Sequence, residues 1–220
     1  MSTIPYELVR SDRKSLALVI DTDAKLIARA PLKMPVEEIE AFINKKKHWI
    51  ADKQKQVEVF GEKHPPVSVR TGESLMYLGN SYAIIKDNVD GIQVNATDIL
   101  VPENYTTDDL IVWLKGEAEK LITERVQHYI NIMGVKPNGI KLSEAKARWG
   151  SCSPKNSLNF AWRLVMCPLS VVDYVVVHEL SHITYKNHSP AFWARVKTVL
   201  PAYEDEQEWL KLNRKIMEII

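Results

Sequence analysis

The feature that most constrains this chain is an apolar run that leads into two histidines four residues apart. Residues 171–177 are almost entirely apolar, and the pentapeptide that follows reads His-Glu-x-x-His, with His178, Glu179 and His182. We expect a largely buried helix that begins near Ser170, a residue suited to the N-cap. Residues four apart share one face of a helix, so both imidazoles can reach a single metal ion. Glu179 lies about 100° around the helix and stays free to act as a base.

A third metal ligand has to come from outside this helix. The segment 186–190 has the composition of a turn and can fold His188 back toward the metal. The alternative is a carboxylate on the next helical stretch, where Glu204, Glu206 and Glu208 are available, although these three also suit a solvated helix face. We favour His188, which has no other obvious purpose. Three protein ligands leave one position of zinc for water, as in catalytic rather than structural sites.

Such a site predicts metal-assisted hydrolysis. Zinc would lower the pKa of its bound water to about 7, and Glu179 would take the proton and pass it to the leaving group. Arg148 and Arg163 are candidates for binding a carboxylate or phosphate or for steadying a developing oxyanion, and Tyr185 is a candidate hydrogen-bond donor to the transition state. Each residue also has a structural interpretation: ion pairing for the arginines, packing at the helix end for the tyrosine. A histidine pair that only serves the core is the corresponding alternative for the motif.

Four segments carry a resemblance to a known family: Arg-Trp-Gly-Ser-Cys at 148–152, Asn-Phe-Ala-Trp-Arg-Leu at 159–164, the helix with 178–182, and Asn-His-Ser-Pro-Ala-Phe-Trp at 187–193. Together they resemble the YgjP-like metallopeptidases, which are related to the WLM and SprT-like zincins. The resemblance implies that His178, His182 and His188 bind zinc. It also implies a metal-dependent hydrolase, with peptide-bond cleavage following from the zincin architecture. A nucleoside triphosphate pyrophosphatase activity, attributed to relatives, is the alternative for the same site.

The order of patterns along the chain predicts an α+β protein with two domains. The chain has 220 residues, of which 45% are hydrophobic, enough for one large or two small cores. Residues 1–105 are predicted to form a β-rich domain with a mostly antiparallel sheet and a helix over 36–57. Residues 106–220 are predicted to form a minimal zincin-like domain, with a backing helix over 107–134, strands at 140–147 and 157–165, the active-site helix and C-terminal helices.

The predicted partner is an extended peptide, or a nucleotide under the alternative activity. A strand at 157–161, if it lies at a sheet edge, could pair with a peptide by adding it as a further strand. The formal net charge of +1 does not indicate a surface that binds nucleic acid. The lysine-rich stretch 45–55 is the local exception, and we interpret it as the solvated face of a helix rather than a phosphate-binding patch.

Two further patterns concern the cellular location of the protein and the redox state of its cysteines. No apolar run approaches the length of a membrane helix, and residues 1–10 lack the apolar core of a signal peptide, so we expect a cytoplasmic location. Cys152 and Cys167 are too few for a disulfide framework and are expected to be reduced thiols. Cys152 lies in a segment that carries the resemblance, but we interpret it as a small buried residue rather than a site residue.

Overall fold

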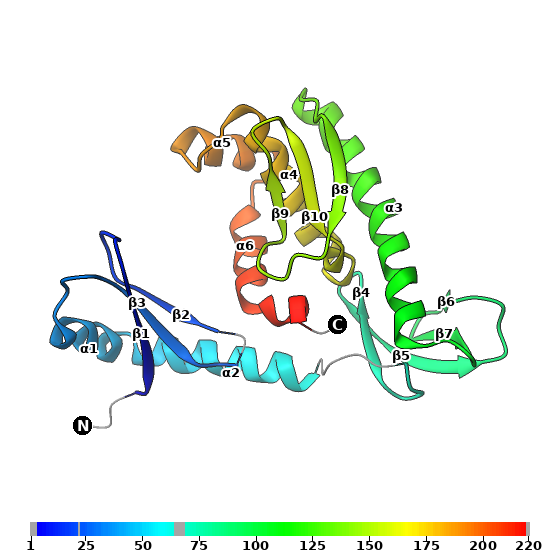
Figure 1. Ribbon diagram of the computed structural model, residues 1–220, viewed down its shortest axis with the longest axis horizontal. Helices are drawn as coiled ribbons and strands as arrows, with labels where there is room; N and C mark the ends of the chain where they lie inside the picture. Colours follow the sequence, from blue (N-terminus) through cyan, green and yellow to red (C-terminus); the bar gives the residue numbers. More distant parts are fainter. Residues whose placement is uncertain (1–3, 22, 64–68, 219–220) are drawn as a thin grey trace. The chain divides into compact units, whose positions relative to one another are not determined.

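The computed structural model describes residues 4–21, 23–63 and 69–218 and contains both helices and strands, which confirms the α+β class (Figure 1). The elements are β1 (Tyr6–Ser11), β2 (Ala17–Ile20), β3 (Leu26–Pro31), α1 (Val36–Lys45), α2 (Lys47–Lys63), β4 (Ser74–Tyr77), β5 (Asn80–Asp87), β6 (Gln93–Val94), β7 (Asp98–Pro102), α3 (Thr107–Met133), β8 (Gly139–Ser143), β9 (Gly150–Cys152), β10 (Ser157–Ala161), η1 (Trp162–Met166), α4 (Leu169–Thr184), α5 (Pro190–Val199), α6 (Tyr203–Leu212) and η2 (Arg214–Glu218).

The chain divides into two compact units. One comprises Met1–Lys63 with Leu212–Lys215, and the other comprises His64–Lys211 with Ile216–Ile220. Strands β4 to β7 therefore belong to the same unit as the helix that carries the His-Glu-x-x-His pattern. The sequence predicts a boundary at residue 105 between two domains that fold independently. That boundary stays a prediction.

The first unit is a three-stranded sheet covered by two helices. Strand β3 is central, with β1 parallel on one side and β2 antiparallel on the other. Alternate residues of β3 are buried and pack with Ile39, Ile43 and Ile50 of α1 and α2. We expected one helix over 36–57, and this was wrong: the helix breaks at Lys46, where φ is −101° and ψ is 10°. No proline or glycine marks this break in the sequence.

Strands β4 to β7 form a second sheet, in the order β4-β5-β7-β6. The strands before residue 105 thus lie in two sheets instead of the one expected, and each sheet contains a parallel pair. Alternating hydrophobicity indicates which face of a strand is buried, but it does not identify the neighbouring strand.

The turn between β4 and β5 packs against the segment that precedes α4. The backbone N–H groups of Leu78 and Gly79 donate to the carbonyls of Val165 (2.8 Å) and Met166 (3.1 Å). Gly79 has φ +81°, and a Cβ at this position would lie 2.8 Å from Pro168. Only glycine combines this backbone conformation with such a close approach. The second sheet therefore supports the start of α4.

Helix α3 backs the second unit. It begins with a capping box formed by Thr106 and Asp109, and it ends at Gly134 in the left-handed conformation (φ 62°). The helix contacts α4, η1 and β8. The guanidinium of Arg125 donates two hydrogen bonds, of 2.6 and 2.9 Å, to the Asp173 carboxylate on α4. This bidentate pair fixes α4 against the backing helix.

The third sheet has the order β8-β10-β9 and lies against α4, which contacts β9 (Figure 1). Our expectation that 157–161 forms an edge strand was wrong, because β10 pairs with β8 on one side and β9 on the other. We expected strands at 140–147 and 157–165, but β8 ends at Ser143 and β10 ends at Ala161, where the 3-10 helix η1 follows. The strand that forms a hairpin with β10 is β9, which the sequence did not predict. The parallel partner β8 could not be inferred from local sequence either. In the described part of the chain, β9 is an edge strand. No helix there is long and apolar enough to cross a bilayer.

Candidate metal centre

Helix α4 is held in the protein core by its valines. Every residue of 171–177 except Asp173 is buried, and burial outweighs the weak helix propensity of β-branched residues. The helix begins at Leu169, directly after Pro168, so Ser170 lies in its first turn and is not the N-cap. The last turns of the helix carry His178, Glu179 and His182 at the spacing that the sequence predicts.

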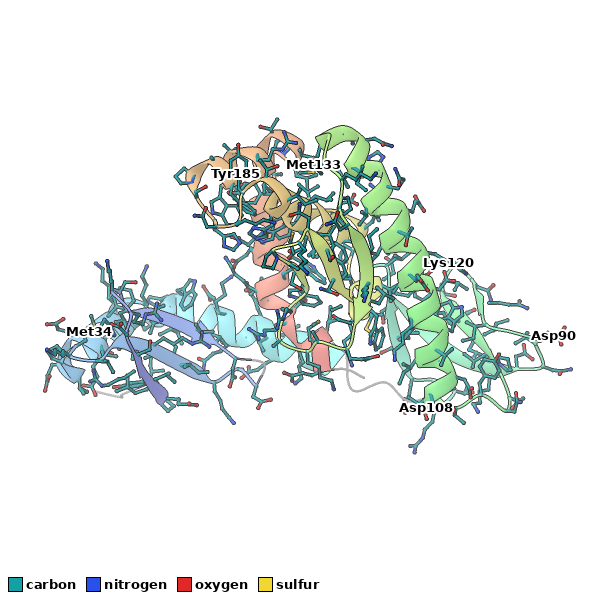
Figure 2. The ribbon with its side chains drawn as sticks, turned by 45° about the horizontal axis from the view of Figure 1, so that its top comes forward. Met34, Asp90, Asp108, Lys120, Met133 and Tyr185 are labelled. Carbon is teal, nitrogen blue, oxygen red and sulfur yellow. The ribbon has the colours of Figure 1, made fainter. Side chains whose placement is uncertain are left out.

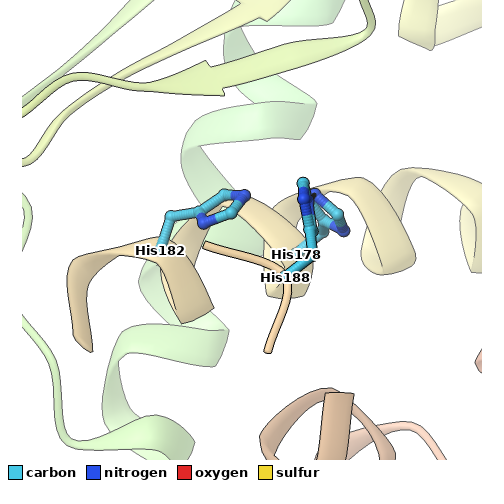
Figure 3. Close-up of side chains that lie close together, drawn as sticks. All are labelled: His178, His182 and His188. Atoms are coloured by element: carbon cyan, nitrogen blue, oxygen red, sulfur yellow. Dashed lines mark hydrogen bonds between the residues drawn. The ribbon is translucent and has the colours of Figure 1, made fainter. Parts of the chain in front are cut away.

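The structure brings the three predicted ligands together. The nearest ring nitrogens of His178, His182 and His188 all lie within 4.8 Å of one another (Figure 3). Nε2 of His178 is 3.0 Å from Nε2 of His188. Two nitrogens bound tetrahedrally to one zinc ion are about 3.4 Å apart, so small ring rotations suffice for both to bind one ion. In the described residues this is the one such group.

The three acidic residues considered as alternative ligands lie outside this group. Glu204 forms an ion pair with Lys197 at 3.4 Å, and Glu208 forms one with Lys211 at 3.8 Å. Glu206 is half-buried on α6. The geometry therefore favours His188 as the third ligand.

The tautomer of His182 is set by the backbone at the end of α4. Nδ1 of His182 lies 2.9 Å from the carbonyl oxygen of Tyr185, which can only accept a hydrogen bond. Nδ1 therefore carries the proton, and the lone pair of the neutral ring is on Nε2. Tyr185, labelled in Figure 2, thus contributes its carbonyl to the centre. Its proposed role as a hydroxyl donor to substrate stays a prediction.

His188 is positioned by the start of α5. Ser189 caps this helix by accepting a hydrogen bond from the N–H of Phe192, and Pro190 occupies its first turn. The imidazole of His188 stacks on Trp193, with ring centroids 5.5 Å apart and an interplanar angle of 22°. The loop residue is therefore held by a capped helix and an aromatic contact.

A column of aromatic rings continues from Trp193 back to α4. Trp193 stacks on Tyr203 (5.3 Å) and Tyr203 stacks on Tyr174 (6.2 Å). The Tyr174 hydroxyl lies 3.5 Å from Nδ1 of His178 and accepts a hydrogen bond from Gln207. Sequence reasoning missed this column, although Tyr174 lies one helical turn before His178 and shares its face.

Replacing Tyr174 with Phe is expected to weaken metal binding about tenfold, because the Nδ1 side of His178 loses its polar contact. Competition with a chromophoric chelator measures the affinity. The matched control is Tyr82→Phe in β5, which should bind metal like the wild type. Equal affinities for the Tyr174 variant and the wild type would show that the hydroxyl does not support the ligand.

The electrostatic environment keeps the helix histidines neutral. Burial, followed by the neighbouring His182 and His188, lowers the pKa of His178 to about 3. Burial is also the main cause that lowers the pKa of His182. Neutral imidazole is the form that binds metal, so His178 and His182 do not need to lose protons at neutral pH. The residues present therefore fit a divalent cation with nitrogen ligands.

Glu179 packs its carboxylate against the edge strand. The residue is 5% exposed, and its Oε2 atom is buried with no hydrogen-bond partner in the described part of the protein. Desolvation raises the pKa of Glu179 to about 7, while the charge of Arg148 acts in the opposite direction. A Cβ at Gly150 would lie 2.7 Å from Cγ and 2.8 Å from Oε1 of Glu179. The carboxylate thus occupies space that only a glycine in β9 leaves open.

Replacing Gly150 with Ala is expected to displace the Glu179 carboxylate and to lower kcat about a hundredfold, while metal binding and folding persist. The displaced group is the end of a flexible side chain, so we expect a stability loss of about 1–3 kcal/mol. The matched control is Gly139→Ala in β8, where an added Cβ meets nothing within 4 Å. A wild-type kcat in the Gly150 variant would show that this contact does not position the carboxylate.

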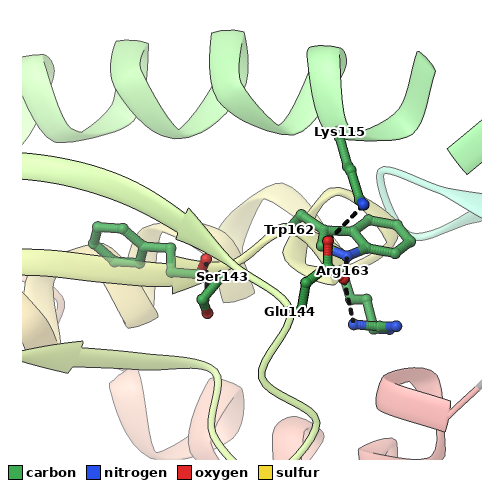
Figure 4. Close-up of polar contacts among 6 residues, drawn as sticks. Lys115, Ser143, Glu144, Trp162 and Arg163 are labelled. Carbon is green, nitrogen blue, oxygen red and sulfur yellow. Dashed lines mark hydrogen bonds and ion pairs between the residues drawn. The ribbon is translucent and has the colours of Figure 1, made fainter. Parts of the chain in front are cut away.

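The two arginines occupy different surroundings. Arg148 is exposed in the β8–β9 loop, within electrostatic range of Glu179. Arg163 is 3% exposed, with its guanidinium over the Trp162 ring and 3.9 Å from Glu144. Glu144 also accepts hydrogen bonds from Trp162 and Lys115 (Figure 4). Arg163 thus contacts Trp162 and Glu144 in the protein interior, as its structural interpretation expects. A substrate-binding role for either arginine stays a prediction.

The cysteines are free thiols. Cys167 is buried, whereas Cys152 on β9 is half-buried, with Sγ 3.9 Å from Nζ of Lys186. Burial is the largest cause that raises the pKa of the Cys152 thiol. We assign no site role to it.

Comparison with known proteins adds the family. No curated protein matches the chain. Two solved structures of metallopeptidase zymogens are similar: abylysin of Pyrococcus abyssi (TM-score 0.38, 18% identity, 40% of this chain and 90% of that one) and jannalysin of Methanocaldococcus jannaschii (TM-score 0.38, 21% identity, 43% and 96%). The model of the YgjP-like, metallopeptidase domain family matches residues 14–213. That match confirms the resemblance inferred from the sequence, and the chain belongs to the YgjP-like metallopeptidase family.

Proposed function

We propose that this protein is a zinc-dependent peptidase in which His178, His182 and His188 hold the metal and Glu179 transfers protons. Its membership of a metallopeptidase family supports a metal-dependent hydrolase of peptides. The observation that carries the proposal is the convergence of three imidazoles whose ligand atoms lie within 4.8 Å of one another. Three nitrogen ligands are typical of catalytic zinc. Zinc bound there supplies Lewis acidity, which polarises the scissile carbonyl and makes water a better nucleophile.

Glu179 is suited to move a proton in both directions. Its carboxylate accepts a proton from the attacking water, whose oxygen bonds to the carbonyl carbon. The same carboxyl group then gives the proton to the amide nitrogen as the carbon–nitrogen bond breaks and the amine leaves. A group whose pKa is raised to about 7 by burial takes up and releases a proton near neutral pH.

Strand β9 is suited to hold the substrate. The carbonyl of Trp149 accepts a hydrogen bond from the N–H of Ala161 in β10. The N–H of Ser153 donates one to the carbonyl of Ser157, also in β10. In an antiparallel pair the direction alternates, so the N–H and C=O groups of Gly150 and Cys152 face the open edge. An extended peptide that adds to this edge as a further strand is bound through its backbone. Because Gly150 touches Glu179, a peptide at this edge lies beside the proposed base.

The test is a parallel assay of peptides and nucleoside triphosphates. We expect zinc-loaded protein to cleave unstructured peptides, with fragments identified by mass spectrometry. Chelation should abolish cleavage and added zinc should restore it. Membership of a metallopeptidase family favours peptide over phosphoanhydride hydrolysis. Hydrolysis of the triphosphates alone would overturn the peptidase proposal.

A further inference from the structure

The part of the chain that builds the candidate centre is much more basic than the whole. Residues 134–199 contain nine Lys and Arg residues and three Asp and Glu residues, a net charge of +6, whereas the whole chain carries +1. This segment includes the third sheet, α4 and α5. The balancing acidic residues lie elsewhere along the chain.

The three acidic residues of this segment cannot neutralise its surface. Asp173 is engaged by the guanidinium of Arg125. Glu144 interacts with Lys115 and with Trp162. Glu179 is buried. Among the exposed cations of the segment, Lys197 pairs with Glu204 on α6, outside the segment. The acidic residues of the segment itself leave its other exposed cations unneutralised.

Several of these cations flank the edge strand β9. Lys146 and Arg148 precede the strand, and Lys155 lies in the turn that follows it; all three are exposed, and within the described residues none forms an ion pair. Lys186, from the loop that carries His188, reaches the same turn and donates to Asn156 and to the Ser153 carbonyl. These acceptors are uncharged, so neither of them neutralises the positive charge of Lys186. Positive charge thus lies beyond both ends of β9.

We propose that the substrate is an extended peptide with acidic side chains on both sides of the scissile bond. The inference rests on the proposed function, because it concerns the peptide held at β9. Three residues of strand span about 10 Å, so side chains two or three positions from the bond come near these cations. Charges at that range interact across a Debye length of about 8 Å at physiological salt. Complementary charge increases the rate of encounter and selects between partners.

The test compares three peptides that share one central sequence and carry Glu, Gln or Lys on both flanks. We expect the Glu peptide to be cleaved with a kcat/KM about tenfold above that of the Gln peptide, and the Lys peptide to be poorest. The advantage should shrink as salt shortens the Debye length. Cleavage of the Glu and Gln peptides at equal kcat/KM, or preference for the Lys peptide, would overturn the inference and leave the peptidase proposal standing.

A charge-reversal variant localises the preference. Lys155→Glu should reduce the advantage of the Glu peptide several-fold. Lys120→Glu on α3, which makes the same change in net charge, should leave it intact (Figure 2). Lys120 is the matched control because its side chain is 77% exposed and it pairs with Glu117 on the same helix. Equal effects of the two variants would mean that only the overall charge matters, against the inference.

Binding provides a readout that does not depend on turnover. Fluorescence anisotropy with the Glu179→Gln protein and labelled peptides should show tighter binding of the Glu peptide than of the Gln peptide. If that preference appeared but the wild-type protein cleaved no peptide, the peptidase proposal would fail while the acidic-peptide site would stand. Tighter binding of a single-stranded oligonucleotide than of the Glu peptide would assign the surface to nucleic acid and overturn the inference.

Discussion

Replacing Glu179 with Gln is expected to leave zinc bound and to lower kcat about a thousandfold, the range assigned to a general base. Gln has nearly the shape of Glu, so it can occupy the same pocket beside Gly150, but it cannot accept a proton from water. None of the three proposed ligands is altered. Single-turnover cleavage of a fluorogenic peptide measures the loss, and metal analysis of the purified variant measures the zinc content.

The control for this substitution is Glu119→Gln on α3, where the carboxylate is exposed to solvent. It removes the same charge and should keep both zinc and activity. Wild-type turnover in the Glu179 variant would show that the base is another group. Loss of zinc together with activity would show that Glu179 supports the metal ligands instead of the proton transfer.

The parts of the centre that follow a fixed local geometry could be predicted from the sequence. The four-residue spacing puts His178 and His182 on one helix face, and the turn after α4 brings His188 to them. The buried character of α4 follows from its valines. These inferences depend on helix periodicity and on a short loop, and both are local properties of the chain.

The parts that depend on contacts between distant segments could not be predicted. Strand β8 pairs with β10 in parallel, across a gap of thirteen residues, and this pairing moves the edge of the sheet to β9. Gly150 touches Glu179 from a different element, 29 positions earlier in the chain. The approach of Tyr203 to Tyr174 similarly depends on how α6 packs on α4. Local patterns leave such pairings open because many partners satisfy the same alternation.

Replacing His188 with Ala is expected to weaken zinc binding by more than about a hundredfold, since the loss of a direct ligand should exceed the ten- to hundredfold cost of losing a supporting contact. His188 is exposed and contributes little to the core, so the fold should persist. His178 and His182 remain on α4 and keep a weak two-ligand site. Competition with a chromophoric chelator measures the affinity, and circular dichroism checks the fold.

The controls separate His188 from the acidic residues of α6 and from its own loop. Single substitutions of Glu204, Glu206 and Glu208 by Ala should leave zinc affinity unchanged, as should Asn187→Ala beside the histidine. His188→Cys, which offers zinc a thiolate in place of the imidazole, should recover part of the lost affinity. If removing one of the glutamates weakened zinc binding while His188→Ala did not, the third ligand would be a carboxylate of α6, and the 3.0 Å approach of His188 to His178 would be a contact between two histidines without a shared ion.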